Sequence, residues 1–461
     1  MVFSSAVFLF IFLPLTLLVY YVAAPRFRNC ILLFASLFFY SWGEPKNVFI
    51  MILSIIANYV FALLISRLCR RKLLQNIIFV AAILFNVGLL FYFKYVDFAI
   101  KNLNSIFNSE IRLRNIALPI GISFFTFQIL SYVIDVKRQK VPVQKNILNL
   151  GLYISFFPQL IAGPIVRYID VNEQINNRKV DIQKFSAGCL RFMSGFSKKI
   201  LIADQLSPYV DKIFSQHGIS APSAWLGIVA YTLQIYFDFS GYSDMAIGLG
   251  KMFGFDFLEN FNYPYIAKSV KDFWRRWHIS LSQWFRDYVY IPLGGNRVGK
   301  VRVFTNLLVV WFLTGFWHGA SWNFIFWGLY YFTFLMIERL PCWKKTENVP
   351  AALKHLYSVF VIMFGWILFR EAGARNSLKY IRNLFVFNAD SFGDLIGIAD
   401  RKFFFCILIG VALSMPIVPY LKLKFGAKAQ TAISVAVCIV FVVAISVLLG
   451  TGFSPFLYFR F

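Results

Sequence analysis

Apolar stretches long enough to cross a lipid bilayer recur along this chain from one end to the other. They include Val48–Leu64, Ile77–Tyr92, Trp225–Gly250, Val303–Phe316, Phe403–Tyr420 and Thr431–Gly450. The hydrocarbon layer is about 30 Å thick and takes about 20 helical residues to cross. Charged residues make up only 15% of the chain, against about a quarter in soluble domains. We predict an all-α polytopic membrane protein, one domain over residues 1–461, with about ten to twelve transmembrane helices.

The basic residues indicate how the chain is oriented. The first apolar run, Val2–Ala24, has no positive residues before it, and Arg26 and Arg28 follow it. Because lysine and arginine gather on the cytoplasmic side, we expect a retained first span with its N-terminus outside. The net charge of +25 resides largely in short loops such as Arg67–Lys72 and Lys137–Lys140. This placement favours contact with anionic lipid headgroups, and we expect no nucleic-acid partner.

Several kinds of site lack support in the sequence. The six cysteines form no CxxC pair, and the four histidines lack the spacing of a zinc site. There is no Walker loop and no GxGxxG motif, so ATP-driven transport is not indicated. We therefore predict no metal site and no bound cofactor.

Two segments combine helix-breaking and polar residues within an apolar setting. They read LPIGISFFTFQ (Leu118–Gln128) and SFFPQLIAGPIVRY (Ser155–Tyr168). In lipid, a broken helix is tolerated only where protein or a water-filled cavity satisfies the freed backbone groups. We expect both segments to face an interior cavity, with Gln128 and Gln159 among its polar lining.

A third segment, Tyr231–Gly250, carries acidic residues within a predicted span. Gln234 and Asp238 are four residues apart and share one face of a helix, so they are expected to line the same interior path. A carboxylate in a span is costly and is a candidate functional group. The alternative is an acid that pairs with an arginine of a neighbouring helix for packing, and the sequence leaves both open.

Residues 262–300 form a charged block that we expect to lie at, or re-enter from, the cytoplasmic face. We predict an amphipathic helix there, with tryptophans at 274, 277 and 284 on one face and Lys271 and Arg275 projecting elsewhere. His278 lies in this block, and His318 lies in the apolar segment that follows.

The two histidines are candidates for acid–base chemistry. A lone buried histidine is often a core residue bonded to a backbone carbonyl, and that reading stays open. His278 and His318 flank one turn-containing connection, however, so they could reach the same cavity. A neutral imidazole, with an ordinary pKa of about 6.5, can take a proton from an attacking hydroxyl.

The motifs DFWRRWHISLSQWFRDYVYIPLGGNR, FWHGASWNFIFWG, SFFPQLIAGPIVRY and YFDFSGYSDMAIGLG together resemble the membrane-bound O-acyltransferase family, in its alginate O-acetyltransferase-like branch. The resemblance runs from about residue 41 to the last phenylalanine. It implies tilted helices around a tunnel, with His318 as the essential histidine and His278 as the second. It also implies acyl transfer from a cytosolic thioester toward a hydroxyl of an extracytoplasmic polymer, completed by an SGNH-type partner, in a bacterial cytoplasmic membrane.

The donor site is predicted from charge and from the same motifs. Acyl-CoA is polyanionic, and basic side chains near the membrane surface suit its phosphates. The predicted donor-binding residues are Lys271, Arg275, Arg276, Trp274, Trp317 and Asn323. Headgroup anchoring is the alternative role for each basic residue. The residues of these motifs favour acetyl-CoA as the donor. Transfer of D-alanyl or another acyl group is an alternative function, and so is transport by a secondary transporter or channel.

The final segment, GTGFSPFLYFRF, is rich in aromatic residues, and one of them, Tyr458, carries a hydroxyl. Lysines 422, 424 and 428 are expected in a cytoplasmic loop between the last two spans, which places the C-terminus outside. Residues 453–461 are then expected to return into the outer funnel. Tyr458 is either part of an aromatic plug or, by resemblance to a Phe-x-Tyr-x-x-Phe motif of a D-alanylation subunit, an acyl carrier.

Overall fold

The structure is a computed structural model that describes residues 1–161, 163–216, 218–387, 393–451 and 456–457. Over these residues the chain forms helices joined by turns, and no β-strand is present among them. The chain divides into two compact units. Unit 1 comprises Met1–Phe192 and Met245–Leu258, and unit 2 comprises Met193–Asp244 and Glu259–Phe461. The single domain over residues 1–461 stays a prediction.

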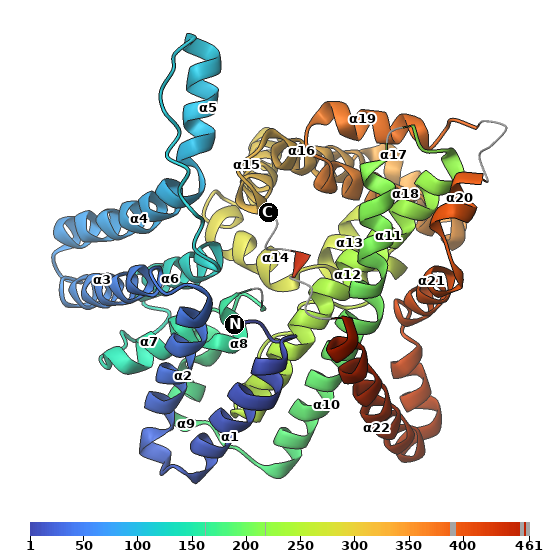
Figure 1. Cartoon of the computed structure of the whole chain (residues 1–461). Helices are drawn as coiled ribbons and strands as arrows, with labels where there is room; N and C mark the ends of the chain where they lie inside the picture. Colours follow the sequence, from blue (N-terminus) through green and yellow to red (C-terminus); the bar gives the residue numbers. More distant parts are fainter. Residues whose placement is uncertain (162, 217, 388–392, 452–455, 458–461) are drawn as a thin grey trace. The chain divides into compact units, whose positions relative to one another are not determined.

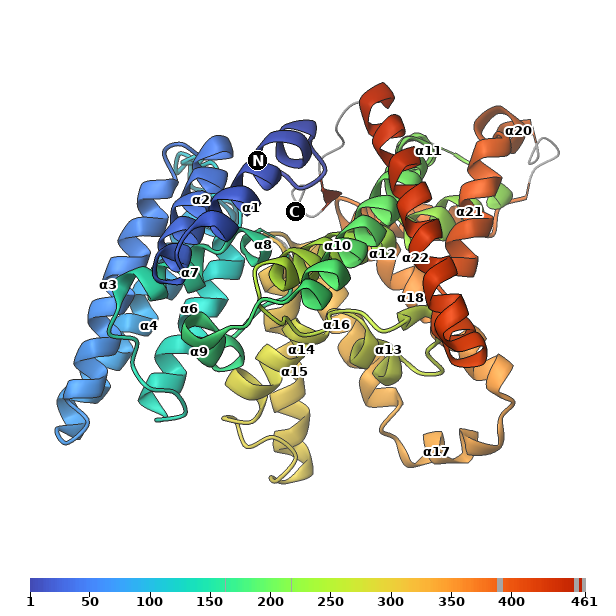
Figure 2. The ribbon, with the colours of Figure 1, turned by 90° about the horizontal axis from the view of Figure 1, so that it is seen from below.

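Unit 1 is an assembly of helices in which α3 and α4 lie side by side and α5 continues beyond α4 (Figures 1 and 2). Its helices are α1 (Leu13–Val22), α2 (Arg28–Gly43), α3 (Val48–Arg67), α4 (Lys72–Lys94), α5 (Val96–Phe107), α6 (Ile122–Lys137), α7 (Ile147–Ser155), α8 (Phe157–Leu160), α9 (Tyr168–Asn177) and most of α10 (Ile182–Lys198). A π-helical turn over Phe8–Phe12 precedes α1.

Most of the described residues in both helix-breaking segments of unit 1 are buried, as the cost of exposed backbone groups in lipid requires, although Leu118 is exposed. Gly121 has a φ of +77°, and a Cβ there would lie 2.7 Å from the carbonyl oxygen of Leu160, so the break before α6 packs directly on the end of α8. Gln159 bonds the carbonyl of Tyr153. The side chain of Gln128 is fully buried and finds no hydrogen-bond partner among the described residues.

Unit 2 is also helical, with α15 packed along α16 and α16 along α18. Its helices are the end of α10, α11 (Asp204–Ser215), most of α12 (Ala221–Met252), α13 (Val270–Arg276), α14 (Ile279–Phe285), α15 (Lys300–His318), α16 (Trp322–Ile337), α17 (Pro341–Lys344), α18 (Ala351–Arg370), α19 (Ala374–Asn383), α20 (Gly393–Ile398), α21 (Arg401–Leu413) and α22 (Ile417–Thr451). π-Helical turns occupy Lys199–Ala203 and Arg286–Tyr290.

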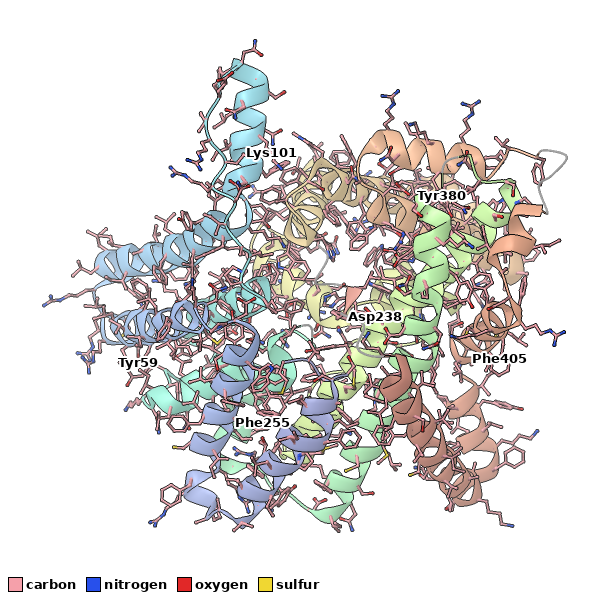
Figure 3. All side chains as sticks on the ribbon, viewed as in Figure 1. Tyr59, Lys101, Asp238, Phe255, Tyr380 and Phe405 are labelled. Atoms are coloured by element: carbon pink, nitrogen blue, oxygen red, sulfur yellow. The ribbon has the colours of Figure 1, made fainter. Side chains whose placement is uncertain are left out.

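Five of the described helices are long and apolar enough to cross a membrane: α3, α4, α15, α18 and residues 417–450 of α22. Two further apolar stretches, Phe8–Val22 and Trp322–Ile337, are shorter. In the most apolar windows of α4 and α22 only 17% and 11% of the residues are buried. Apolar side chains such as Phe405 also point outward (Figure 3), which suits a surface in contact with lipid. The protein is an all-α membrane protein, and the total of ten to twelve spans stays a prediction.

The expected span Phe403–Tyr420 is wrong as a continuous helix. α21 ends at Leu413 and α22 begins at Ile417. Pro416 explains the interruption, because proline lacks an N–H and disfavours helical backbone in the residue before it. Lysines 422, 424 and 428 lie on either side of a sharp break at Gly426, with φ of +59° and ψ of −135°, where two helices counted together as α22 meet. They therefore lie near a junction between two helices, as expected, although the connection is a break at one residue and not a longer loop. The cytoplasmic side of this junction stays a prediction.

Close approach of α10 and α12 determines the interior of unit 2. A Cβ on Gly241 of α12 would lie 2.7 Å from the carbonyl oxygen of Gly195 on α10 and 3.3 Å from the backbone nitrogen of Lys199. Small residues let two helix backbones approach in this way. The contact brings Lys199, which begins the π-helical turn after α10, against Asp238 on α12.

We expect Gly241→Ala to destabilise the protein by about 1–3 kcal/mol, because the added methyl group overlaps backbone that has no flexible end to move. Thermal unfolding in detergent measures the change. Gly88→Ala on α4 is the matched control, since a Cβ there meets nothing within 4 Å. Equal melting temperatures for the two variants would contradict the packing argument.

Candidate active site

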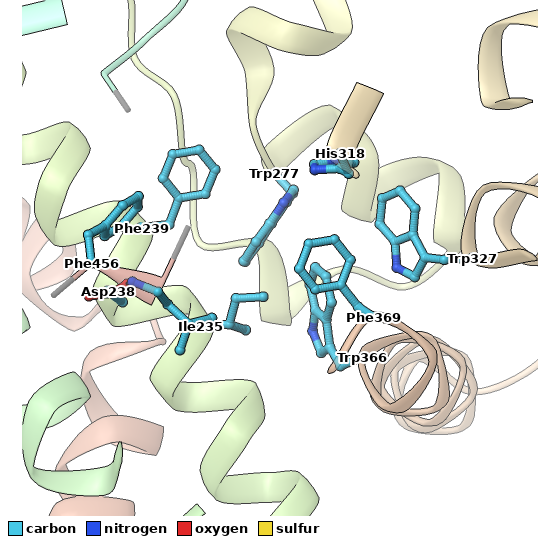
Figure 4. A pocket seen from close by; sticks show the side chains of 10 residues that line it. Ile235, Asp238, Phe239, Trp277, His318, Trp327, Trp366, Phe369 and Phe456 are labelled. Carbon is cyan, nitrogen blue, oxygen red and sulfur yellow. The ribbon is translucent and has the colours of Figure 1, made fainter. Parts of the chain in front are cut away.

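The described residues of unit 2 enclose a pocket of about 360 Å³, part of which is open to solvent. Aromatic rings form most of its wall, and Asp238 and His318 are its ionisable residues (Figure 4). In that view Asp238 and Phe456 lie on one side and His318 and Trp327 on the other. The lining residues are Ile235, Asp238, Phe239, Trp277, His318, Trp327, Trp366, Phe369, Phe456 and Leu457. An apolar hollow with few polar groups is typical of a small-molecule site.

His318 is the last residue of α15 and is only 6% exposed. Its imidazole makes T-shaped contacts with Trp327, at 4.9 Å between ring centroids, and with Phe369, at 5.3 Å. α15 and α16 pack tightly because Gly315 and Gly328 place backbone against backbone. His318 lines the pocket, whereas His278, which was expected to reach the same cavity, is not among the lining residues. The catalytic role of each histidine stays a prediction.

His278 lies between two short helices, α13 and α14, with a left-handed backbone (φ +45°). The expected amphipathic helix is therefore wrong, because the chain turns at Trp277 and His278 and the three tryptophans do not share one helical face. His278 is 1% exposed and contacts Phe239, at 4.7 Å, and Trp317, at 6.2 Å between ring centroids. Trp317 also contacts His318, at 5.0 Å, so one indole lies against both histidines.

Asn260, which the sequence analysis missed, determines the tautomer of His278. Its Oδ1 accepts from the backbone N–H of Ser280 (3.2 Å) and from the Ser280 hydroxyl (2.9 Å), so this atom is the amide oxygen. His278 Nδ1 lies 3.1 Å from the same oxygen and must donate to it. The Asn260 amide group in turn donates to Ser243 Oγ at 3.0 Å.

The remaining nitrogen of His278, Nε2, is consequently a proton acceptor. It is buried and has no hydrogen-bond partner among the described residues. His278 lies outside the five candidate spans, and burial lowers the pKa of its imidazole to about 3, so the ring is neutral. Such an imidazole, with one fixed N–H and one open lone pair, can accept a hydrogen bond, and its lowered pKa makes it a weaker base than an ordinary histidine.

Asp238 pairs with a lysine rather than with the arginine that the packing alternative required. Lys199 Nζ donates to Asp238 Oδ1 (2.9 Å) and to Asp204 Oδ1 (2.7 Å), and the Lys199 side chain is 2% exposed. The other oxygen of Asp238 accepts from the backbone N–H of Leu457 (2.7 Å). Asp238 is therefore both paired and part of the pocket wall.

The π-helical turn explains the pairing of Lys199 with Asp204. Its backbone hydrogen bond runs from the Asp204 N–H to the Lys199 carbonyl, five residues back. In an α-helix, with 3.6 residues per turn, residues five apart lie well around the helix from one another. The sequence signal was the pair Lys198-Lys199 followed by an aspartate at 204, a spacing that α-helical periodicity does not connect.

The predicted basic donor cluster lies on or next to α13. The side chains of Lys271 and Arg275 are exposed. Arg276 is engaged locally, since its Nε donates to Asp272 Oδ1 at 3.0 Å. Glu338, after α16, accepts from the backbone N–H groups of Val270 (2.6 Å) and Lys271 (3.0 Å) and so fixes the start of α13.

The other predicted donor-binding residues have structural contacts. Trp274 is 9% exposed and packs on the rings of Trp311 and Tyr331, with centroids at 5.0 and 4.8 Å. Asn323 donates to the carbonyl of Glu371. Their role toward a donor stays a prediction.

Three further predicted site residues are not part of the pocket as described. Gln128 and Gln159 belong to unit 1. Gln234 is buried on α12, one turn before Asp238, and does not line the pocket. Tyr458 lies outside the described residues. Within the described part of the chain, no three His, Cys, Asp or Glu side chains gather as metal ligands.

We expect Asn260→Leu to lower the free energy of unfolding, because three buried donors on Ser280 and His278 lose their acceptor. Loss of a buried hydrogen-bond acceptor that leaves its donor unsatisfied costs about 1–3 kcal/mol, and the Nδ1–H of His278 is the donor most affected. Thermal unfolding in detergent measures the loss. Asn376→Leu on α19 serves as control, since Asn376 is exposed and bonds only the carbonyl of Ala372 in the structure. A wild-type melting temperature for Asn260→Leu would refute the assigned network.

Comparison with known proteins identifies the family. The sequence model of the membrane-bound O-acyltransferase family matches residues 54–371. The chain is 38% identical over 499 residues to the probable alginate O-acetylase of Azotobacter vinelandii, with 100% of both chains covered. It is 35% identical over 427 residues to the peptidoglycan O-acetyltransferase of Helicobacter pylori, covering 85% of this chain and 81% of that protein.

A third relative, the teichoic acid D-alanyltransferase of Streptococcus thermophilus, is 33% identical over 249 residues, which cover 50% of this chain and 59% of that protein. The family match includes His278, His318 and Asp238. Of the two classes left open by the sequence, enzyme and transporter, the comparisons confirm the enzyme. The chain belongs to the membrane-bound O-acyltransferase family and is an acyltransferase.

Proposed function

We propose that this membrane enzyme transfers an acetyl group from a cytosolic thioester, acetyl-CoA, toward hydroxyl groups of an extracytoplasmic polysaccharide. The observation that carries the proposal is the pocket that holds His318 together with Phe456 and Leu457. These two residues directly precede Tyr458 in the sequence. The two residues that precede the proposed acyl acceptor in the sequence therefore line the pocket of the proposed base.

The relatives support acetyl as the group transferred. The two relatives that share most of their length with this chain are named as O-acetyl-transferring enzymes, one for alginate and one for peptidoglycan. D-alanyl transfer is the second candidate, because a teichoic acid D-alanyltransferase also matches. That match covers only half of this chain, so it supports D-alanyl transfer less strongly than the two longer matches support acetyl transfer.

The proposed first step is acyl transfer to Tyr458. His318 removes the phenolic proton as the tyrosine oxygen attacks the thioester carbonyl. The new C–O ester bond forms, the C–S bond breaks, and the proton passes to the departing thiolate to give the free thiol. The aromatic rings around His318 fix its orientation, and their faces favour the positive charge that the imidazole acquires.

The proposed second step passes the acetyl group to an extracytoplasmic acceptor. A serine of an SGNH-type partner attacks the acetyl-tyrosine ester, which frees the tyrosine hydroxyl and leaves the acetyl group on the partner for transfer to the polymer. His278 is the second proton acceptor. Its bond with Asn260 keeps the proton on Nδ1 and leaves Nε2 as the accepting nitrogen. We place the enzyme in the bacterial cytoplasmic membrane with both termini outside, in contact with anionic lipids through its basic loops.

We expect Tyr458→Phe and His318→Ala each to abolish acetyl transfer, because one lacks the attacking oxygen and the other lacks the base. Radiolabel moved from acetyl-CoA to the purified protein, and then to polymer in membranes, measures the two steps. Tyr458→Phe keeps the aromatic ring and removes only the hydroxyl. Wild-type transfer by this variant would leave Tyr458 as a plug and end its proposed role as carrier.

We expect Arg275→Glu to raise the KM for acetyl-CoA by about tenfold or more, because an exposed cation near the donor phosphates becomes an anion. kcat at saturating donor should change little. Lys101→Glu on α5 is the control for a general charge effect, since Lys101 is exposed in unit 1 (Figure 3). An unchanged KM in Arg275→Glu, with normal membrane insertion, would show that Arg275 has no part in donor binding.

A further inference from the structure

Asp238 makes two bonds of different kinds with its two carboxylate oxygens. Oδ1 accepts from Lys199 Nζ at 2.9 Å, and Oδ2 accepts from the backbone N–H of Leu457 at 2.7 Å. The carboxylate is 4% exposed, so both bonds are shielded from solvent. A charge-assisted hydrogen bond to a backbone amide is about twice as strong as a neutral one. The segment at Leu457 is thus held by its backbone rather than by a side chain.

The charges around Asp238 leave the carboxylate available for this bond. Two carboxylates, Asp204 and Asp238, share the single ammonium of Lys199. The Leu457 N–H supplies positive partial charge at the carboxylate oxygen that Lys199 does not reach.

The residue before Leu457 is held by ring packing. Phe456 is 2% exposed, and its ring lies 5.0 Å from that of Tyr242 and 5.9 Å from that of Phe239. Phe456, Leu457 and Asp238 all line the pocket that contains His318 (Figure 4). A backbone bond and a ring contact together define both the depth and the direction of this segment in the pocket.

We propose that Asp238, held in place by Lys199, is a positioning residue that anchors the Phe456–Leu457 backbone in the His318 pocket and thereby places the next residue for acyl transfer. This inference rests on the proposed function. It assigns no proton transfer to Asp238. The buried carboxylate instead holds the Leu457 backbone in place through one hydrogen bond.

The anchor itself is tested by amide hydrogen–deuterium exchange of the peptide containing Leu457, in the full-length protein in detergent. We expect Asp238→Asn to speed exchange of this amide at least tenfold. Asp244→Asn is the matched control: Asp244 is buried on the same helix and pairs with Lys198 at 2.5 Å, but it does not line the pocket. In Asp244→Asn the Leu457 amide should exchange at the wild-type rate. Unchanged exchange in Asp238→Asn would overturn the anchor.

The positioning role is tested by removing the same bond from its other end. Leu457→Pro deletes the amide hydrogen and leaves Asp238 intact, whereas Leu457→Ile keeps the hydrogen. We expect Asp238→Asn and Leu457→Pro each to lower kcat for label transfer from acetyl-CoA at least tenfold, with little change in the donor KM. The double variant should lose no more than the larger single loss, because both changes remove one interaction.

The outcomes separate this proposal from the proposed function. Full additivity in the double variant, or a wild-type kcat in Leu457→Pro, would refute the positioning role. If Tyr458→Phe transfers normally while Asp238→Asn still speeds Leu457 exchange, the carrier role fails and the anchor stands. His318→Ala, which should block transfer without altering Leu457 exchange, confirms that the exchange measurement reads the anchor and not activity.

Discussion

The buried ammonium of Lys199 is the interaction on which the interior of unit 2 depends. A charge removed from water is costly, and losing one partner of such a pair costs about 3–5 kcal/mol. Lys199 meets this cost with two carboxylates, one from the helix that follows it and one from α12. The close contact of Gly195 with Gly241 makes the second pairing possible. The close packing of the two glycines therefore allows the ion pair to form, and the ion pair in turn holds the two helices together.

Much of the fold followed from the spacing of apolar residues. The spans at α3, α4 and α15 were predicted because crossing a bilayer requires long apolar helices, which can be recognised in the sequence. The expected span Trp225–Gly250 forms a helix, α12, which is not among the five candidate spans. The errors occurred where a single residue breaks a helix. Pro416 divided one expected span, and the left-handed backbone of His278 divided the expected amphipathic helix. Hydropathy and periodicity are averages over many residues, so they do not register a break at one position.

The candidate site was predictable to the extent that residues carry unusual chemistry in an apolar setting. His318 and Asp238 stood out for that reason, and both line the pocket. Asn260 and Lys199 did not stand out. Asn260 acts through contacts with residues 17 to 20 positions away, and Lys199 acts through a helical turn with unusual spacing. Such roles arise from tertiary geometry, and no local pattern in the sequence encodes them.

The π-helical turn at Lys199–Ala203 has a consequence for how this family of sequences can change. A π turn holds one residue more than the α-helical turn it replaces. Deleting one residue between Lys199 and Asp204 would restore α-helical spacing and leave the lysine and the aspartate four residues apart, which still places them on one face of a helix. Adding one residue would place them six residues apart, and an α-helix turns such residues away from each other. The pairing should therefore survive the loss of one residue from this turn better than the gain of one.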